Sequence, residues 1–311
     1  MLIPNLPLLP LAPECQRIFH GRGHCFAGLE GITLDYLPPC LLVTQFTPMA
    51  LADKQQLVQQ LTQWWATLGT DVFRLVWQNR SVSPAQTESI GAPPPSPHWA
   101  AEGDLWFELN FFRGQNYGLF LDMANGRQWV RQHSHGKKVL NLFAYTCAFS
   151  VFAKAGGATE VVNLDMSKPA LAQGQRNHRR NNLEAGVRYL GHDLFKTFGK
   201  LKKLGPFDLV IVDPPSFQQG SFIATKDYPR LLRRLASLLA PNGEALLCLN
   251  APELSRAYLR EQVQTHAPEL AYVEQLENPK SFVEQNPDRG LKVLRYRLKP
   301  QESREVAMAQ G

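Results

Sequence analysis

The sequence predicts a doubly wound, Rossmann-like α/β domain preceded by a small α+β domain. Three apolar strands carry this prediction, because each runs into residues that can face a ligand. The run VLNLFAYT starts at Val139 and enters a turn of small and aromatic residues, VVNLD ends at Asp165, and DPPSF follows a third strand at Asp213. Ligands bind at the carboxyl ends of the strands in such folds. We therefore expect a nucleoside site where these strands end.

Residues 1–80 form the predicted α+β domain. β-Branched, aromatic and periodic apolar residues predict strands at 34–36, 40–46 and 72–77 and a helix at 52–68. The sequence FHGRGH at 19–24 is expected to be a loop, either a plain surface turn or a loop that contacts substrate. Residues 81–98 have the Pro, Ser and Gly content of an extended linker.

Residues 99–311 form the predicted ligand-binding domain. A β-hairpin is expected first, with strands at 105–112 and 117–121. Strands then alternate with helices, which favours a parallel sheet with right-handed crossovers. The expected elements are a helix at 123–132, strand 139–143, helix 147–155, strand 160–164, helix 168–181, strands 187–190 and 207–212, helix 227–239 and strand 243–249. Two final strands, at 272–277 and 290–298, predict an antiparallel edge.

Composition limits the classes of function. The chain has 311 residues, 44% hydrophobic residues and a net charge of +6, which fits two domains and permits an anionic partner such as nucleic acid. Five scattered cysteines form no C-x-x-C pair, so neither disulfides nor a metal site are expected. Prolines interrupt the apolar start MLIPNLPLLPLAP, and no run approaches the ~18 apolar residues of a membrane span. A soluble, cytoplasmic protein is expected.

The turn after the first strand of the α/β domain distinguishes between cofactors. A dinucleotide site needs G-x-G-x-x-G there so that the backbone can approach a pyrophosphate. The turn at 141–148 reads NLFAYTCA and contains no glycine. A nucleoside cofactor without phosphate fits better, and S-adenosylmethionine (SAM) is the expected one.

The motifs, taken in order, resemble a known family. LNLFAYTCAFSVFAKAGGATEVVNLDMSKPAL, followed by DPPSF and preceded by GLFLD, is similar to the bacterial 23S ribosomal RNA methyltransferases of the RlmI and RlmK/L kind over about residues 104–298. The resemblance implies a class I methyltransferase fold, SAM as cofactor and an RNA substrate. The N-terminal part lacks an evident PUA domain, the small RNA-binding module of RlmI. Cys147 and Ala148 replace the family's glycines, and a cysteine adopts a positive φ only at a cost.

Candidate cofactor residues lie at the strand ends. Asp165 can accept both ribose hydroxyls of an adenosine, about 20 residues after the first turn; the alternative is a helix N-cap, a role that Ser167 could fill instead. Asp193, in GHDLF, can accept a hydrogen bond from the adenine amine or be a plain loop acid. The other candidates, of which 141 and 143–145 would act through backbone groups, are Asn141, Phe143, Tyr145, Thr146, Met166 and Leu194.

Asp122 is a further candidate, because GLFLD at 118–122 with Arg127 beyond resembles a family signature that covers the cofactor. A carboxylate near the sulfonium or the methionine ammonium would offset positive charge. The alternative is a salt bridge between Asp122 and a neighbour such as Arg127.

DPPSF at 213–217 is the catalytic candidate. Its two prolines fix the turn after a buried strand and present the Asp213 carboxylate, which is also a cofactor candidate, and the Pro214 carbonyl toward the transferred methyl group. An acid there can hold or deprotonate a nitrogen nucleophile. Phe217 offers a face on which a flipped base could stack. The alternative is an ordinary turn.

Cysteine placement bears on the target base. Methylation at cytosine C5 needs a thiolate nucleophile, which the RlmI-like enzymes place just after the strand that ends here at Leu249. This chain has Asn250 there, Cys248 lies inside the apolar strand, and DPPSF has Ser216. A guanine nitrogen, as in the RlmK-like enzymes, is therefore expected, and the adenine N6 signature would need an aromatic residue at 216. Three alternatives stay open: cytosine C5 methylation of ribosomal RNA, a methyltransferase that acts on a protein or a small molecule, and a SAM-binding module without turnover.

Basic residues occur in three clusters. Each cluster is either a solvated helix face or part of an RNA-binding groove. The clusters are Arg176, Arg179 and Arg180; Lys196, Lys200, Lys202 and Lys203; and Arg230, Arg233 and Arg234.

Overall fold

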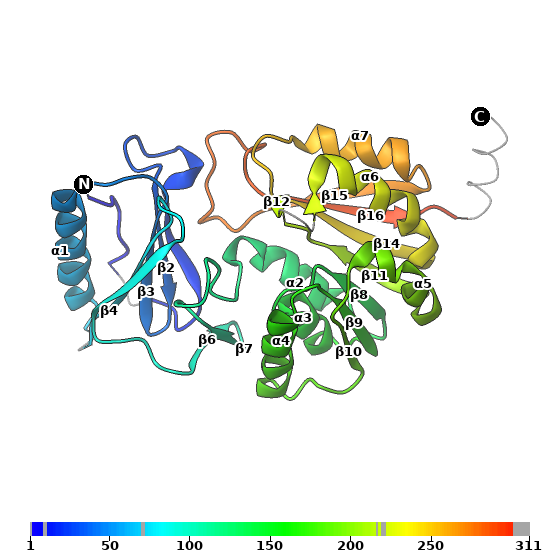
Figure 1. The fold of residues 1–311 in the computed structure, drawn as a ribbon, viewed down its shortest axis with the longest axis horizontal. Helices are drawn as coiled ribbons and strands as arrows, with labels where there is room; N and C mark the ends of the chain where they lie inside the picture. The colour runs from blue at the N-terminus through cyan, green and yellow to red at the C-terminus, as the bar shows by residue number, and fades with distance from the viewer. Residues whose placement is uncertain (1, 9–10, 70–71, 216, 219–221, 301–311) are drawn as a thin grey trace. The chain divides into compact units, whose positions relative to one another are not determined.

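A computed structural model describes residues 2–8, 11–69, 72–215, 217–218 and 222–300. The chain forms two compact units (Figure 1). The first comprises Met1–Asp122 and Pro279–Pro287, and the second comprises Met123–Asn278 and Asp288–Gly311. The chain therefore leaves the second unit for a short stretch before it returns to complete that unit's sheet.

The described part of the first unit is an α+β layer with one α-helix, a five-stranded sheet and a separate two-stranded hairpin. The sheet has the order β1-β2-β3-β4-β5, with β3 and β4 parallel and the other neighbours antiparallel. Leu57, Leu61, Trp64 and Trp65 form the buried side of the helix, as the apolar periodicity predicts. The elements are β1 (Gln16–His20), β2 (Ile32–Leu37), β3 (Cys40–Gln45), α1 (Leu51–Thr67), β4 (Arg74–Asn79) and β5 (Gln86–Gly91).

The predicted linker and hairpin are wrong in position. Residues Gln86–Gly91 of the predicted linker form β5, an edge strand without a buried residue, so hydrophobic content could not reveal it. The hairpin lies earlier than predicted, with β6 (His98–Glu102) and β7 (Leu105–Leu109) joined at Gly103, whose φ is +60°. The contact pattern places the boundary of the first unit at Asp122 rather than in the linker.

The FHGRGH segment of the first unit is mostly buried, and only Arg22 and His24 are exposed. A Cβ at Gly21 would lie 1.9 Å from the Leu29 carbonyl oxygen, and one at Gly23 would lie 1.7 Å from that of Val283, so both positions require glycine. Burial, with Arg17 and Arg22 nearby, lowers the pKa of His20 to about 3. The neutral ring accepts from Arg17 at Nδ1 and donates from Nε2 to Glu284 at 3.3 Å. The segment is therefore not a plain surface turn, and contact with substrate stays a prediction.

The second unit is the predicted doubly wound domain. Its seven-stranded sheet has the order β10-β9-β8-β11-β14-β16-β15. β16 is antiparallel to both neighbours, one place in from the edge. The elements are α2 (Ala124–Gln132), β8 (Lys138–Leu142), α3 (Ala148–Ala155), β9 (Glu160–Leu164), α4 (Lys168–Arg180), β10 (Val187–Leu190), α5 (Leu194–Leu204), β11 (Phe207–Val212), β12 (Phe217–Gln218), β13 (Phe222–Ile223), α6 (Ala224–Leu235), β14 (Leu239–Leu249), α7 (Arg256–His266), β15 (Leu270–Leu276) and β16 (Lys292–Leu298).

Helices cover both faces of this sheet (Figure 1). Val139 of β8 packs with α2 and α3 on one face, and α4 packs beside α3. Leu140 and Leu142 point to the other face and pack with α5, α6 and α7. This alternation follows from the two-residue period of a strand buried on both faces. Within the described part of the chain, no helix is long and apolar enough to cross a membrane.

Candidate cofactor and catalytic site

The three strand ends singled out in the sequence meet at one edge of the sheet. Leu142, the last residue of β8, pairs with Leu164 of β9 and with Val212 of β11. All three strands are parallel, so the turns that follow them lie side by side. The register thus brings the first turn, Asp165 and Asp213 to neighbouring positions.

The turn after β8 holds its backbone in an unfavourable conformation. Phe143, Tyr145 and Cys147 have φ values of +57°, +46° and +62°. Each such residue costs on the order of 1–3 kcal/mol and persists only where its surroundings over-determine it, as in ligand-binding sites. The positive φ foreseen at Cys147 is therefore present without glycine, together with two more that the sequence did not indicate.

Asp165 holds this turn in place. Its Oδ2 accepts from the Tyr145 backbone N–H at 2.8 Å, and its Oδ1 accepts from that of Ser167 at 2.7 Å. Ser167 supplies the N-cap of α4, accepting from Ala170 N–H at 3.3 Å, so the carboxylate is not the helix cap. A carboxylate has about four lone-pair sites, and Asp165 keeps acceptor capacity for a ligand.

Gly174 of α4 makes room for the cysteine of the turn. Cys147 is completely buried, and a Cβ at Gly174 would lie only 2.4 Å from its Sγ. Burial, with a smaller effect from Asp165, raises the pKa of this thiol well above its usual value. Cys147 therefore acts as a packed, protonated side chain and not as a nucleophile.

A chain of buried polar side chains lies beneath the turn. Its direction is fixed at one end because His178 Nδ1 lies 2.8 Å from the Gly174 carbonyl and must donate to it. His178 Nε2 then accepts from Ser150 Oγ at 2.9 Å, and Ser150 Oγ accepts from Asn163 Nδ2 at 3.0 Å. Asn163 Oδ1 in turn accepts from Asn141 Nδ2 at 3.0 Å. We call these four side chains the buried polar chain.

The buried polar chain ties β8 and β9 to α3 and α4, the elements that flank the turn. All four side chains are at most 1% exposed, so a broken link would leave a buried group unsatisfied. Burial lowers the pKa of His178 to about 4, which keeps its ring neutral. Asn177, next to His178, donates from Nδ2 to the Thr146 carbonyl at 3.0 Å and so ties the turn to α4.

The Asn141 side chain is therefore occupied within the buried polar chain, and the expected contact of its backbone with a ligand stays a prediction. Thr146 is likewise buried, at 1% exposure. Of the two apolar side chains predicted to contact the cofactor, Leu194 is buried and Met166 is 51% exposed. Met166 is thus the more accessible of these two side chains.

Asp193 serves as the N-cap of α5. Its Oδ1 accepts from Lys196 N–H at 3.0 Å. The sequence prediction omitted α5 and so gave a plain loop acid as the alternative. Because the cap uses one carboxylate oxygen, the other is left for the proposed contact with an adenine amine.

The DPPSF motif follows β11. Asp213 is half-buried and Pro214 is buried. Ser216 lies outside the described residues, and Phe217 is described only as the backbone that opens β12. The predicted stacking role of Phe217 therefore stays a prediction.

Two aromatic residues that the sequence did not single out connect the motif to the first turn. Phe222, on β13, packs edge-on against Phe143 with ring centroids 5.1 Å apart and against Tyr228 at 5.8 Å. The Tyr228 hydroxyl donates to the Cys248 carbonyl at 2.6 Å. Burial, with contributions from Cys248 and Asp213, raises the pKa of Tyr228 well above its usual value. Tyr228 is thus a neutral residue in electrostatic contact with Asp213.

Two other sequence candidates occupy different settings. Asp122 belongs to the first unit. Burial lowers the pKa of Arg17, whereas Asp35 and, more weakly, Asp122 raise it. Burial raises the pKa of Tyr117, and Asp35 and Asp122 raise it further. Cys248 is completely buried within β14, as predicted. Over the described residues, no group of three or more His, Cys, Asp or Glu side chains could hold a metal ion.

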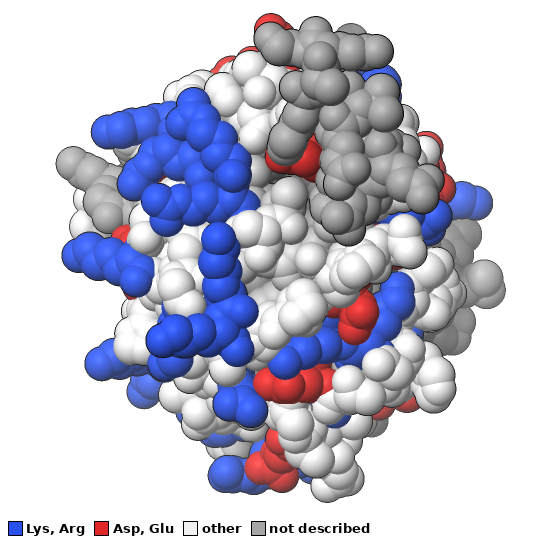
Figure 2. All heavy atoms as spheres, turned by 90° about the vertical axis from the view of Figure 1, so that its right-hand side faces the viewer, with Lys and Arg blue, Asp and Glu red and all other residues white. Residues whose placement is uncertain are grey.

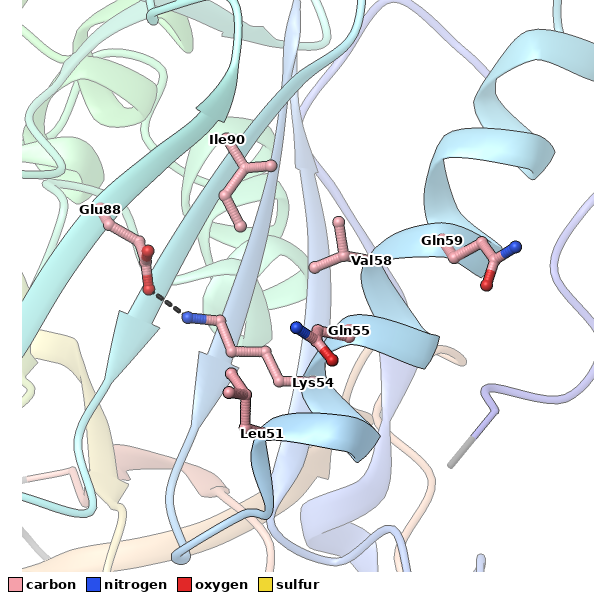
Figure 3. Close-up of a pocket in the computed structure, with 7 residues that line it drawn as sticks. All are labelled: Leu51, Lys54, Gln55, Val58, Gln59, Glu88 and Ile90. Carbon is pink, nitrogen blue, oxygen red and sulfur yellow. Dashed lines mark hydrogen bonds and ion pairs between the residues drawn. The ribbon is translucent and has the colours of Figure 1, made fainter.

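A hollow of about 330 Å³ in the first unit is not a catalytic candidate. Its lining residues come from α1 and β5 and include none of the sequence candidates. Figure 3 shows Lys54 and Glu88 pointing toward each other as an ion pair at this hollow. These two charges satisfy each other, and the other polar lining residues are Gln55 and Gln59.

The fold and the strand-end site define a class I methyltransferase. A model of the S-adenosylmethionine-dependent methyltransferase family matches residues 16–297, and the chain belongs to this family. Ribosomal RNA large subunit methyltransferase I of Aeromonas salmonicida is 29% identical over 232 residues, covering 70% of this chain and 57% of that protein. The chain thus spans little more than half the length of this relative.

Two further likenesses agree with the family. Ribosomal RNA large subunit methyltransferase K/L of Shewanella sp. (strain MR-4) is 39% identical over 153 residues, covering 46% of this chain and 21% of that protein. The solved structure of a SAM-dependent methyltransferase from Agrobacterium tumefaciens superposes with a TM-score of 0.68 at 18% identity, covering 96% of this chain and 95% of that one. At that identity the structural likeness supports the fold alone.

Proposed function

We propose that this chain is a SAM-dependent methyltransferase that methylates a guanine nitrogen of ribosomal RNA. The observation that carries the proposal is the meeting of the strained turn, Asp165 and Asp213 at the carboxyl edge of β8, β9 and β11. The names of the relatives support ribosomal RNA as the substrate.

The residues present fit SAM. The turn presents backbone groups where a glycine-rich turn would otherwise lie, Asp165 keeps acceptor capacity for ribose hydroxyls, and Met166 is accessible beside it. Asp193 has one oxygen left for the adenine amine. When bound, SAM supplies a sulfonium methyl group, which passes to the nucleophile and leaves S-adenosylhomocysteine.

Asp213 and Pro214 orient the nucleophile in this proposal. A ring nitrogen with a free lone pair, such as guanine N7, attacks without losing a proton, so the Asp213 carboxylate would there position the base and offset the positive charge that forms on the ring. An exocyclic amine would transfer a proton to the Asp213 carboxylate as the N–C bond forms. In both cases positioning supplies most of the rate enhancement.

Cytosine C5 is disfavoured as the target by the placement of the cysteines. Cys147 and Cys248 are both completely buried, and the exposed position after β14 is Asn250. Neither thiol is accessible to attack a base. RNA carrying 5-fluorocytosine should therefore form no covalent complex with the protein, and a complex abolished by Cys248→Ser would contradict this part of the proposal.

Nucleoside mass spectrometry of ribosomal RNA from a deletion strain tests the proposal. We expect one methylated guanosine to disappear and to return when the wild-type gene, but not Asp213→Ala, is restored. Unchanged ribosomal RNA methylation, together with transfer of labelled methyl groups to protein or small molecules, would overturn it in favour of another substrate. SAM binding without transfer to any RNA would indicate a binding module. A cytoplasmic location remains a prediction.

A further inference from the structure

Helices α5 and α6 form a basic surface built on aromatic rings. The Arg230 guanidinium lies over the Phe195 ring at 3.9 Å from its centroid, and that of Arg234 lies over Phe198 at 4.9 Å. These contacts place the two helices side by side and hold both arginines against the protein surface. With the exposed Lys196 and Lys200, these residues make up what we call the α5–α6 patch.

The α5–α6 patch carries a net positive charge, although Arg230 is paired with Asp227 at 2.8 Å. Helix α5 contains no acidic residue, and α6 contains only Asp227, which is buried and accepts from Ile223 N–H and from Arg230. Figure 2 shows lysine and arginine side chains gathered on one part of this side of the molecule with few acidic side chains among them. Such a concentration of positive charge attracts a polyanion.

The α5–α6 patch lies next to the candidate site along the chain and in the fold. Helix α5 begins directly after Asp193, and α6 begins after the segment that follows DPPSF. Phe195 lies in the first turn of α5, next to the carboxyl edge of the sheet, and Arg230 contacts its ring from the second turn of α6. A substrate that followed the patch toward this edge would arrive at Asp213.

We propose that the α5–α6 patch is the docking surface for the RNA substrate, an inference that rests on the proposed function. Lysines and arginines neutralise backbone phosphates, which supplies most of the affinity and makes it dependent on salt. Guanidinium planes stacked on rings are also surfaces on which unpaired RNA bases stack. An acidic protein segment would use the charges alone.

Helix α4 provides a matched control. Arg176 and Arg180 are exposed and have the same four-residue spacing as Arg230 and Arg234, but α4 packs beside α3, on the other face of the sheet. The variants to compare are R230E/R234E and R176E/R180E, which change the charge by the same amount. The variant R230K/R234K keeps the charge of the patch and removes the stacked guanidinium planes.

The test measures binding of a structured ribosomal RNA fragment at several salt concentrations, methyl transfer to the same fragment, and SAM affinity. R230E/R234E should weaken RNA binding at least ~10-fold at 0.1 M salt and lower the slope of log K against log salt by about 1.4–1.8, for two lost contacts. SAM affinity should stay within ~2-fold. R176E/R180E should change RNA binding by less than ~3-fold, and R230K/R234K should keep the slope within ~0.5 of wild type.

The outcomes separate the two proposals. If wild type binds and methylates the RNA but R230E/R234E does so equally well, or if R176E/R180E loses as much, the docking inference is wrong and the proposed function stands. If wild type binds the RNA through the patch but transfers no methyl group, the proposed function is wrong and the docking surface stands. If wild type does not bind the RNA at all, both are wrong, and an acidic partner for the patch becomes the better interpretation.

Discussion

The two faces of the seven-stranded sheet differ in the side chains that they bury and in the surface that their helices expose. On the face of α3 and α4, a buried polar chain of four side chains crosses the core and supports a turn with three positive φ values. On the face of α5, α6 and α7, the core cluster is almost entirely aliphatic and aromatic, and the outside carries stacked arginines. The first face fixes the backbone that a cofactor would contact, whereas the second offers a charged surface to a large substrate.

The largest effect is expected at Asp213, which lies between the two faces at the end of β11. Asp213→Ala should lower kcat by ~10²-fold or more, the usual scale of general acid–base or positioning residues, while SAM affinity stays nearly intact. Cys248→Ser is the control, because a buried thiol that takes no part in the reaction should leave turnover largely in place. Equal kcat in Asp213→Ala and wild type, measured by steady-state kinetics, would remove Asp213 from the mechanism.

The buried polar chain should govern stability on its own face. Asn163→Ala removes one acceptor and one donor at once and leaves Asn141 and Ser150 unsatisfied, so the free energy of unfolding should fall by about 2–4 kcal/mol. Asn250→Ala, at an exposed site, should change it by less than about 0.5 kcal/mol. Denaturant unfolding measures both. Equal stability of the two variants would mean that the buried polar chain does not stabilise the turn.

The same face should make stability depend on pH through His178. Its folded pKa of about 4 lies below the unfolded value of about 6.5, so protons bind preferentially to the unfolded state. The stabilisation is complete above pH 6.5 and is lost as the pH falls, by about 2 kcal/mol between pH 7.5 and 5 from this residue. His20, in the first unit, acts in the same direction. Unfolding curves of H178Q that keep the full wild-type slope over this range would contradict the assignment.

The smallest of these effects compares two acids that follow neighbouring strands. Asp165 both holds the Tyr145 N–H and has acceptor capacity left, whereas Asp193 uses one oxygen to cap α5. Asp165→Ala should therefore weaken SAM binding by about 1.5 kcal/mol or more, the scale of a hydrogen bond to a charged group. Asp193→Ala should weaken it less and should cost about 1 kcal/mol of stability through the lost cap. Calorimetry that ranked the two acids in the reverse order would overturn this comparison.

Most of the second unit could be predicted because its strands are continuous apolar runs. The predicted strands at 160–164, 187–190 and 207–212 agree with β9, β10 and β11. β5 was missed because an exposed edge strand has no apolar signal, and α5 was missed although LFKTFGKLKKL alternates apolar and basic residues as an amphipathic helix does. The chain order of motifs was sufficient to place Asp165 and Asp213 at one edge.

The contacts that support the turn could not be predicted. The buried polar chain joins side chains from β8, β9, α3 and α4, and each of its residues alone fits a core or surface position equally well. The cost of a positive φ at Cys147 was visible from the sequence, but the space that Gly174 leaves for its side chain depends on how α4 packs. The same is true of the stacked arginines on α5 and α6.

Methyl transfer from labelled SAM to ribosomal RNA of the deletion strain tests the central claim most directly. The purified wild-type protein should label one guanosine, identified by mass spectrometry of the digested RNA, and Asp213→Ala should label it at least ~10²-fold more slowly. Label on a cytidine carbon, or no label in RNA while SAM still binds, would contradict the account.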